Sequence, residues 1–254
     1  MEAHHRRPLR WLAVFVLPLL LTACKSKPKL VDVDPSFSKY IEAYTSGVIS
    51  KKNTIRIQLA VDATVTHTLN ETIQGKLFDF SPSVEGKAYW VDARTIEFKP
   101  DKDLTPDQLY EASFSLGKIL HVPDAFKTFR FNVQVIKPSF AVEDFGLRSN
   151  NKTTMTLTGQ VTTADVETSA AVEKLLSASL SNTNLTISWQ HNEANRIHNF
   201  TISNIQRSNA AGTLQLSWTG QPLGLDITGS KEVSVPAIGD FTVLNIRAVQ
   251  EQEQ

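Results

Sequence analysis

The sequence contains one cysteine, Cys24, in 254 residues. A chain with a single thiol cannot form an internal disulfide, so the fold must be held by its core alone. Charge of either sign is not in excess either, because 26 basic residues balance 26 acidic ones. No block of like charge stands out, and we therefore expect no nucleic-acid partner and no electrostatically driven membrane surface.

Long apolar runs are also missing. The one continuous run, Trp11 to Leu21, is far shorter than the ~20 residues needed to cross the ~30 Å hydrocarbon core of a bilayer. A transmembrane helix is therefore disfavoured. Three arginines precede the run (Arg6, Arg7 and Arg10), and Leu21-Thr22-Ala23-Cys24 closes it. This arrangement is typical of a secretory signal peptide, which we predict over residues 1–23.

The four closing residues resemble the bacterial lipobox, in which a small residue precedes a cysteine that is acylated and becomes the new N-terminus. Cys24 is accordingly the predicted lipidation site, carrying diacylglycerol and an amide-linked fatty acid such as palmitate. Three acyl chains satisfy the rule that stable anchoring takes more than one chain. The expected partner is thus the membrane, reached through the lipid anchor.

Residues 24–35 are short, polar and bounded by proline, which is typical of a spacer between an anchor and a folded domain. Lys25 and Ser26 follow the cysteine without the acidic run that some bacteria use for export to the outer face. We therefore expect a lipid-anchored protein of the bacterial cell envelope that faces the periplasm.

The first folded region, residues 36–136, shows apolar residues at every second position. Alternation of this kind predicts half-buried strands over 55–61, 96–98, 110–116 and 129–135. Turn-forming clusters separate these segments, among them Ser81-Pro82-Ser83 and Asp92-Ala93-Arg94. Short strands at near-regular spacing predict an all-β fold, an Ig-like β-sandwich. In this register Phe131 points inward and Arg130 outward.

A second β domain is predicted over residues 137–250, leaving 251–254 as a tail. Lys137-Pro138 marks the boundary, because a proline there would interrupt a continuing ladder. Alternation predicts strands over 155–161, 185–189, 200–202, 214–218, 233–235 and 240–249, with Trp218 inward and Gln215 outward. One helix is inserted: Asp165 to Leu180 has near-helical apolar spacing, and Thr163 or Asp165 can cap its start.

No catalytic constellation stands out. The chain has no Gly-x-Ser-x-Gly elbow and no phosphate-binding glycine loop, and an acylated Cys24 is not free to be a nucleophile. We therefore predict that the protein is not an enzyme, and we assign no catalytic residue and no cofactor.

Two groups of residues could be mistaken for metal sites. His191 and His198 are seven residues apart, which matches no standard zinc spacing and on one strand would place them on opposite faces. Asp101, Asp103 and Asp107 are typical of a calcium loop only in part, because the turn glycine and the terminal glutamate are missing. We expect no metal site at either place.

The other candidates have plain structural explanations. Trp90, Trp189 and Trp218 could line a sugar site, but each lies in a strand pattern, where a core position is more frequent. His67 and His121 are expected in solvated loops or strands. The four Asn-x-Thr sequons, which are glycan sites only in eukaryotic secreted proteins, mark polar turns and strand ends at Asn70, Asn151, Asn184 and Asn199.

Several stretches together resemble the N-terminal part of the bacterial alpha-2-macroglobulin family of lipid-anchored, protease-trapping proteins. In the first domain they are Tyr44 to Ser50, Gly86 to Pro100 and Leu104 to Tyr110. In the second they are Trp189-Gln190-His191, His198-Asn199-Phe200 and Val233 to Phe241.

The resemblance implies two macroglobulin-type β domains that form the anchored scaffold of an endopeptidase inhibitor. The partners it implies are proteases or the remaining inhibitor domains. The family's bait segment and Cys-Gly-Glu-Gln thioester cannot be carried over, because the lone cysteine lies in the lipobox. The resemblance therefore favours a truncated or split member. The alternative is a stand-alone Ig-like lipoprotein that binds a carbohydrate or an envelope protein.

Overall fold

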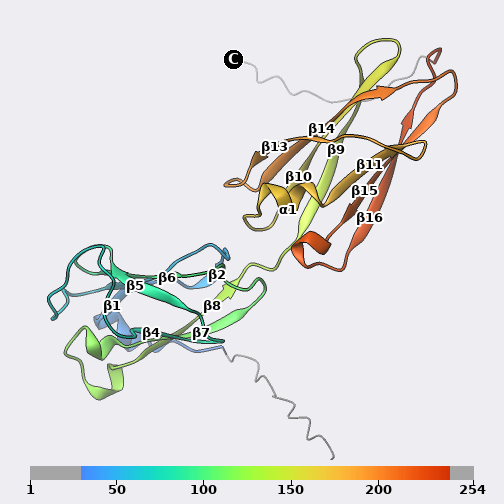
Figure 1. Ribbon diagram of the computed structural model, residues 1–254. Helices are drawn as coiled ribbons and strands as arrows, with labels where there is room; N and C mark the ends of the chain where they lie inside the picture. The colour runs from blue at the N-terminus through green and yellow to red at the C-terminus, as the bar shows by residue number, and fades with distance from the viewer. Residues whose placement is uncertain (1–29, 241–254) are drawn as a thin grey trace, which may run out of the picture.

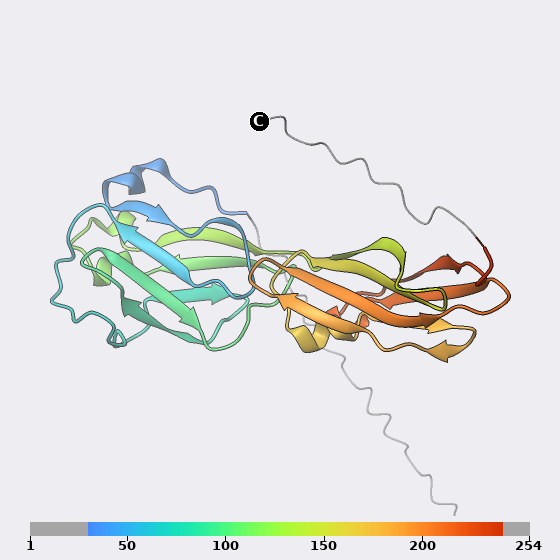
Figure 2. The ribbon, with the colours of Figure 1, turned by 90° about the horizontal axis from the view of Figure 1, so that it is seen from above.

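The computed structural model describes residues 30–240, and within them the protein is almost entirely β-structure. The strands form four four-stranded sheets, arranged as two units that lie end to end (Figures 1 and 2). The predicted all-β class is confirmed at this level. Cys24 and the strand predicted over 240–249 lie outside the described residues, apart from Asp240. No helix in the described part is long and apolar enough to cross a bilayer.

Two sheets of the first unit face each other across one core. Their strands, in spatial order, are β1 (Ile41–Tyr44), β3 (Ile55–Leu59), β6 (Thr95–Pro100) and β5 (Gly86–Trp90) in one sheet, and β2 (Gly47–Ile49), β8 (Phe129–Val135), β7 (Leu109–Phe114) and β4 (Phe78–Ser81) in the other. All pairs are antiparallel except β2 with β8. Three short 3-10 helices lie at Pro35–Lys39, Leu116–Lys118 and Asp124–Phe126.

The first core, within the described residues, combines aliphatic side chains with eight buried aromatic ones. Inward positions alternate along the strands, as the sequence predicts: Phe129, Phe131, Val133 and Val135 are buried and Arg130 is exposed. The predicted strand over 55–61 is shorter than expected, because β3 ends at Leu59 and Val61 is 47% exposed. Part of the predicted spacer packs on this unit: Val33 touches the core, and the Val31 N–H donates to Asn132 Oδ1 at 2.5 Å.

The second unit repeats the two-sheet plan with antiparallel pairs throughout. Its strands, in spatial order, are β13 (Ser188–Asn192), β14 (Ile197–Gln206), β10 (Thr154–Thr163) and β9 (Phe140–Ser149) in one sheet, and β12 (Thr183–Asn184), β11 (Leu176–Leu180), β15 (Gly212–Thr219) and β16 (Thr228–Val235) in the other. A 3-10 helix occupies Gln221–Leu223. The core is separate from the first and mainly aliphatic. Trp218, predicted inward, packs on it only partly buried, while Gln215 is partly exposed.

Neighbouring atoms approach the backbone of β10 closely at Gly159, and this explains the glycine. It lies opposite Phe200 on β14, and a Cβ atom there would come within 2.3 Å of the Phe200 ring and 2.4 Å of the Glu143 carbonyl oxygen. Only glycine leaves room for the ring to lie across the strand.

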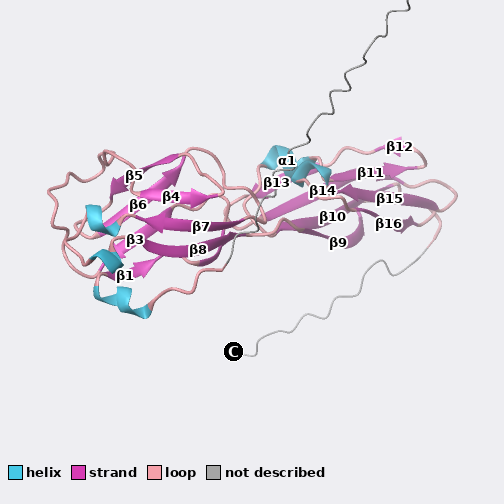
Figure 3. Ribbon diagram, turned by 90° about the horizontal axis from the view of Figure 1, so that it is seen from below, coloured by secondary structure: helices cyan, strands magenta, loops and turns pink. Residues whose placement is uncertain are grey.

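The predicted helix exists but is much shorter than expected. α1 spans Ser169–Glu173, and the Thr168 hydroxyl, rather than Thr163 or Asp165, caps its start by accepting from the Ala171 N–H. Asp165 and Glu167 are held by other contacts before the helix begins. At the far end, Leu176–Leu180 pairs with β15 as a strand, since its buried and exposed residues alternate at period two. Figure 3 shows α1 at the end of the second unit nearest the first.

Candidate functional site

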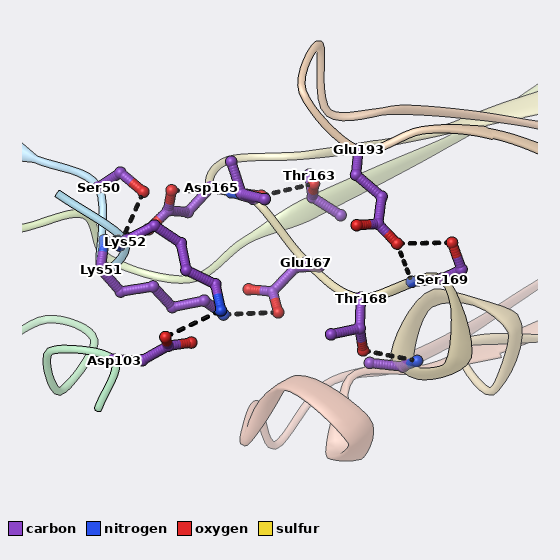
Figure 4. Close-up of polar contacts among 12 residues, drawn as sticks. Ser50, Lys51, Lys52, Asp103, Thr163, Asp165, Glu167, Thr168, Ser169 and Glu193 are labelled. Atoms are coloured by element: carbon purple, nitrogen blue, oxygen red, sulfur yellow. Dashed lines mark hydrogen bonds and ion pairs between the residues drawn. The ribbon is translucent and has the colours of Figure 1, made fainter. Parts of the chain in front are cut away.

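Buried charged residues of the described part of the chain gather where the two units meet, and we call this place the junction: Lys51 of the first unit with Asp165 and Glu167 of the second. Lys51 lies in the turn between β2 and β3, and the two carboxylates lie between β10 and α1. Each of the two carboxylates is more than 110 residues from Lys51 in the sequence. Figure 4 shows the lysine side chain pointing toward Glu167.

Lys51 is held at two points. Its backbone N–H donates to Asp165 Oδ2 at 2.7 Å, and its ammonium group forms an ion pair with Glu167 Oε2 at 2.6 Å. Both carboxylate residues are buried, with 4% and 8% of their surface exposed. A buried ion pair holds two elements in one arrangement, because separating them would leave a charge without a partner in a poorly solvated site.

Local bonds fix the loop that carries the two acids. The other oxygen of Asp165 accepts from the Val166 N–H, and the Thr163 hydroxyl donates to the Asp165 carbonyl oxygen. On the first unit, the Lys51 carbonyl oxygen accepts from the Leu104 N–H. The junction is therefore built on rigid turns rather than on free side chains.

A second, exposed ion pair lies beside the junction. The Lys52 ammonium is 2.8 Å from Asp103 Oδ1, with about half of each side chain exposed. This hydrogen bond raises the pKa of Lys52. Asp103 thus belongs to a polar turn, as predicted, and within residues 30–240 no group of three or more His, Cys, Asp or Glu side chains is placed to hold a metal ion.

The two histidines considered from the sequence lie together, contrary to the prediction of opposite faces. β13 and β14 form a hairpin that pairs His191 directly with His198, and their Nδ1 atoms are 2.9 Å apart. The prediction was wrong because it treated residues 191–198 as one strand and missed the turn between them. The signal was available: Asn192-Glu193-Ala194-Asn195 is a turn-forming stretch flanked by Trp189 and Phe200, which are also cross-strand partners.

The histidine pair is connected to α1. His191 Nε2 lies 3.1 Å from Glu173 Oε1, and at the other end of the helix Glu193 accepts from the backbone N–H and the hydroxyl of Ser169. These two bonds from Ser169 hold the pKa of Glu193 below its usual value. His198 is fully buried, and burial together with the neighbouring His191 lowers its pKa.

The remaining sequence candidates are dispersed. Trp90 is buried in the first core with His67 stacked on it, at a centroid distance of 3.9 Å. Trp189 is half-buried, packs on the second core and stacks on His191. The described structure does not bring Trp90, Trp189 and Trp218 together, since they belong to different sheets.

One open cavity of about 320 Å³ lies in the second unit. Its apolar lining includes Leu180, Leu185 and Val235, and its polar lining includes Asn204, Gln206 and Arg207, whose guanidinium group donates to backbone carbonyl oxygens. No strongly charged cluster or nucleophile–base pair lines it among the described residues. Such a site could take an uncharged group, but it offers no chemistry for a reaction.

Comparison with protein-family models and with curated proteins finds no match. Among solved structures, L,D-transpeptidase 3 from Mycobacterium tuberculosis, in complex with a faropenem-derived adduct, is similar at 13% identity over 48% of this chain, with a TM-score of 0.28. An L,D-transpeptidase from Mycobacterium tuberculosis H37Rv is similar at 13% identity over 61% of this chain, with a TM-score of 0.29. This chain spans 46% and 61% of the length of those two proteins. The TM-scores are too low to relate this chain to either enzyme.

Proposed function

We propose that this chain is the membrane-anchored, non-enzymatic N-terminal scaffold of an alpha-2-macroglobulin-like endopeptidase inhibitor in the bacterial cell envelope. In this proposal Cys24 carries the anchor and the two β units hold the protease-reactive parts of the inhibitor near the membrane. The observation that carries the proposal is the repetition of one strand order in two tandem units joined by a buried ion pair.

The strand order supports the finer interpretation of each unit as an Ig-like, macroglobulin-type sandwich. In immunoglobulin lettering, β1-β3-β6-β5 corresponds to A-B-E-D, and β2-β8-β7-β4 to A′-G-F-C. The second unit follows the same scheme, with β9-β10-β14-β13 as A-B-E-D and β16-β15-β11-β12 as G-F-C-C′. Helix α1 then lies between strands B and C.

A tyrosine corner supports the same interpretation for the first unit. Tyr110, at the start of the strand equivalent to F, accepts a hydrogen bond on its hydroxyl from the Thr105 backbone N–H at 3.1 Å. This is the contact that characterises the corner before strand F in Ig-like domains.

The junction supports a positioning role. A scaffold must present its second unit in a defined direction, and Lys51 holds Asp165 and Glu167 through both its backbone and its side chain. An extended, jointed chain of flexible units would not need two buried carboxylates at the joint.

The anchor is tested by replacing the predicted lipid acceptor. In cells that make the full chain, Cys24→Ala should carry no diacylglycerol and should keep its signal peptide, so that it runs at the larger unprocessed size, whereas the parent protein should show diacylglycerol on Cys24 by mass spectrometry. Recovery of the variant in the membrane fraction at the processed size would refute the anchor.

The scaffold role is tested with proteases. The processed protein is mixed with a panel of endopeptidases, followed by denaturing electrophoresis and by assay of a large substrate. We expect no band of summed mass and no protection of the substrate, because the sole thiol is committed to lipid. In native membranes, crosslinking should capture further macroglobulin-type domains. A covalent protease adduct would instead make this chain an inhibitor in its own right.

The cavity beside Leu180 and Leu185 favours a second candidate function, binding of an uncharged ligand by a stand-alone Ig-like lipoprotein. Saturable binding on a glycan array that is lost in Leu185→Trp, which would fill the cavity, together with no crosslinked macroglobulin-type domain, would favour this function over the scaffold.

A further inference from the structure

His191 and His198 form a buried contact that can hold only a limited number of protons. Their Nδ1 atoms are 2.9 Å apart, which is the length of a hydrogen bond with one hydrogen between the two nitrogens. Because a neutral imidazole has one N–H and one acceptor nitrogen, the surroundings determine which nitrogen carries the hydrogen.

The partners of His191 fix the arrangement of the neutral pair. Glu173 is a carboxylate and accepts only, so His191 Nε2 must carry a hydrogen. The His191 Nδ1 atom is then an acceptor, and His198 must donate to it from its own Nδ1. The remaining nitrogen, His198 Nε2, is buried and is the one buried side-chain polar atom in residues 30–240 without a hydrogen-bond partner.

One added proton is compatible with this geometry, and a second is not. With three protons on the four nitrogens, one Nδ1 atom can still be an acceptor. With four protons, both Nδ1 atoms carry hydrogens, and two hydrogens cannot fit in a gap of 2.9 Å between nitrogens. Two positive rings in a buried site also repel each other.

The charged groups around the pair favour the first proton. Glu173 on α1 contacts His191, and Glu193 in the hairpin turn interacts electrostatically with both rings. Glu193 partly compensates a charge on His198, but burial and the neighbouring His191 outweigh it and lower the pKa of His198.

We propose that the His191–His198 pair is an acid-sensitive clasp that holds the edge strand β13 against β14 while one Nδ1 atom is unprotonated and releases β13 when both rings are charged, and that the contact of His191 with Glu173 passes this movement to α1. Opening moves β13 rather than β14, because β13 is the edge strand of its sheet and β14 is paired on both sides. The loop that carries Asp165 and Glu167 leads directly into α1, so the release occurs next to the junction. This inference does not depend on the inhibitor proposal.

The test follows individual residues by NMR in the processed protein between pH 7.5 and 4.5. The Cε1–H signals of His191 and His198 report their protonation, the indole N–H of Trp189 reports the hairpin because its ring stacks on His191, and amide hydrogen exchange reports α1. We expect His198 to take up its proton below the ordinary pKa of a histidine side chain, because burial lowers its pKa. We also expect the Trp189 signal to move with that step, and exchange of the Val172 and Leu175 amides, corrected for pH, to rise about tenfold or more.

Two variants decide the result. His191→Gln keeps a donor and an acceptor but does not titrate, so the pH response of Trp189 and of α1 should disappear. His198→Leu should have the same effect by removing the buried titrating group, and if it fails to fold, His191→Gln still decides. His67→Gln is the matched control, since His67 also stacks on a tryptophan, and it should leave both responses unchanged. An unchanged response in His191→Gln, or titration of both rings without faster exchange in α1, would overturn the proposal.

Discussion

The two units share a strand order but differ in what fills them. Eight aromatic side chains are buried in the first core, and Phe200 is the single buried aromatic residue in the second, among the residues described. By contrast, the buried polar residues of the described region, Thr163, Asp165, Glu167 and His198, all lie in the second unit. The same architecture therefore tolerates buried polar and charged side chains outside its apolar core.

The position of these polar residues explains the difference. Thr163, Asp165 and Glu167 lie in the segment that meets the first unit, and His198 contacts His191, which in turn contacts Glu173 of α1. Burying such groups costs stability unless each is paired. We infer that the first unit is optimised for stability and that the second gives up stability at one end for a defined arrangement of parts.

The largest expected effect lies in the first core. Phe131→Ala removes a fully buried ring and should lower the free energy of unfolding of the first unit by about 3–5 kcal/mol, because the cavity cannot close completely. Chemical denaturation followed by NMR signals of each unit measures it. Arg130→Ala, on the exposed face of the same strand, should cost less than about 0.5 kcal/mol. Equal losses would show that the register is wrong.

The next effect concerns the junction. Lys51→Met leaves the buried Glu167 carboxylate without its partner, and we expect a loss of about 2–4 kcal/mol together with a broader distribution of distances between spin labels on the two units. Lys52→Met breaks the exposed pair with Asp103 and should cost less than about 1 kcal/mol with no broadening. A narrow distribution in Lys51→Met would mean that the ion pair does not hold the units.

A smaller effect should appear with pH and only in the second unit. The pKa of His198 is lower in the folded state than in the unfolded chain, where it is about 6.5. The stability that depends on a neutral His198 is therefore present above pH 6.5 and is lost as the pH falls below it. The carboxyl groups of the first unit with lowered pKa values, Asp34, Asp79 and Asp92, ordinarily titrate near 3.8. Lowering the pH from 7 to 5 should therefore lower the melting temperature of the second unit by a few degrees, which corresponds to a loss of about 1 kcal/mol of unfolding free energy. Calorimetry measures this shift. An equal shift in the first unit, or no loss of the shift in His198→Leu, would contradict this assignment.

The smallest effect tests the tyrosine corner. Tyr110→Phe removes the hydroxyl that accepts from the Thr105 N–H and should destabilise the first unit by about 1 kcal/mol, since one partly buried hydrogen bond is lost. Tyr89→Phe, on a partly exposed ring of β5, is the control and should cost less than about 0.5 kcal/mol. Denaturant midpoints of the two variants give the comparison, and coincident midpoints would remove this support for the Ig-like interpretation.

Period-two patterns predicted some of the strands that have one buried face and missed others, such as β4. The segment predicted over 129–135 coincides with β8, whereas the segment over 55–61 extended two residues too far, because Val61 is apolar but exposed in the loop after β3. Short apolar runs are ambiguous between helix and strand, and for this reason Leu176–Leu180 was included in the predicted helix. Pairing with β15 decides its structure, and that partner is distant in the sequence. The domain boundary at Lys137-Pro138 stays a prediction.

Of the candidate site, the junction could not be predicted from local pattern, and the histidine pair could be predicted only in part. The junction joins residues more than 110 positions apart, and no periodicity relates Lys51 to Glu167. The histidine pair was within reach of a hairpin register, but the full burial of His198 and the contact of His191 with Glu173 of α1 were not. Tertiary contacts rather than spacing therefore determine the chemistry of both places.

The two points of attachment at Lys51 have a consequence for any partner of the second unit. A single covalent connection through residues 136–139 would act as a swivel about which the second unit could rotate. The additional contacts to Asp165 and Glu167 remove that rotation. A partner then meets the second unit in one orientation relative to the first. The entropy of rotation at the joint is lost when the chain folds and not when the partner binds.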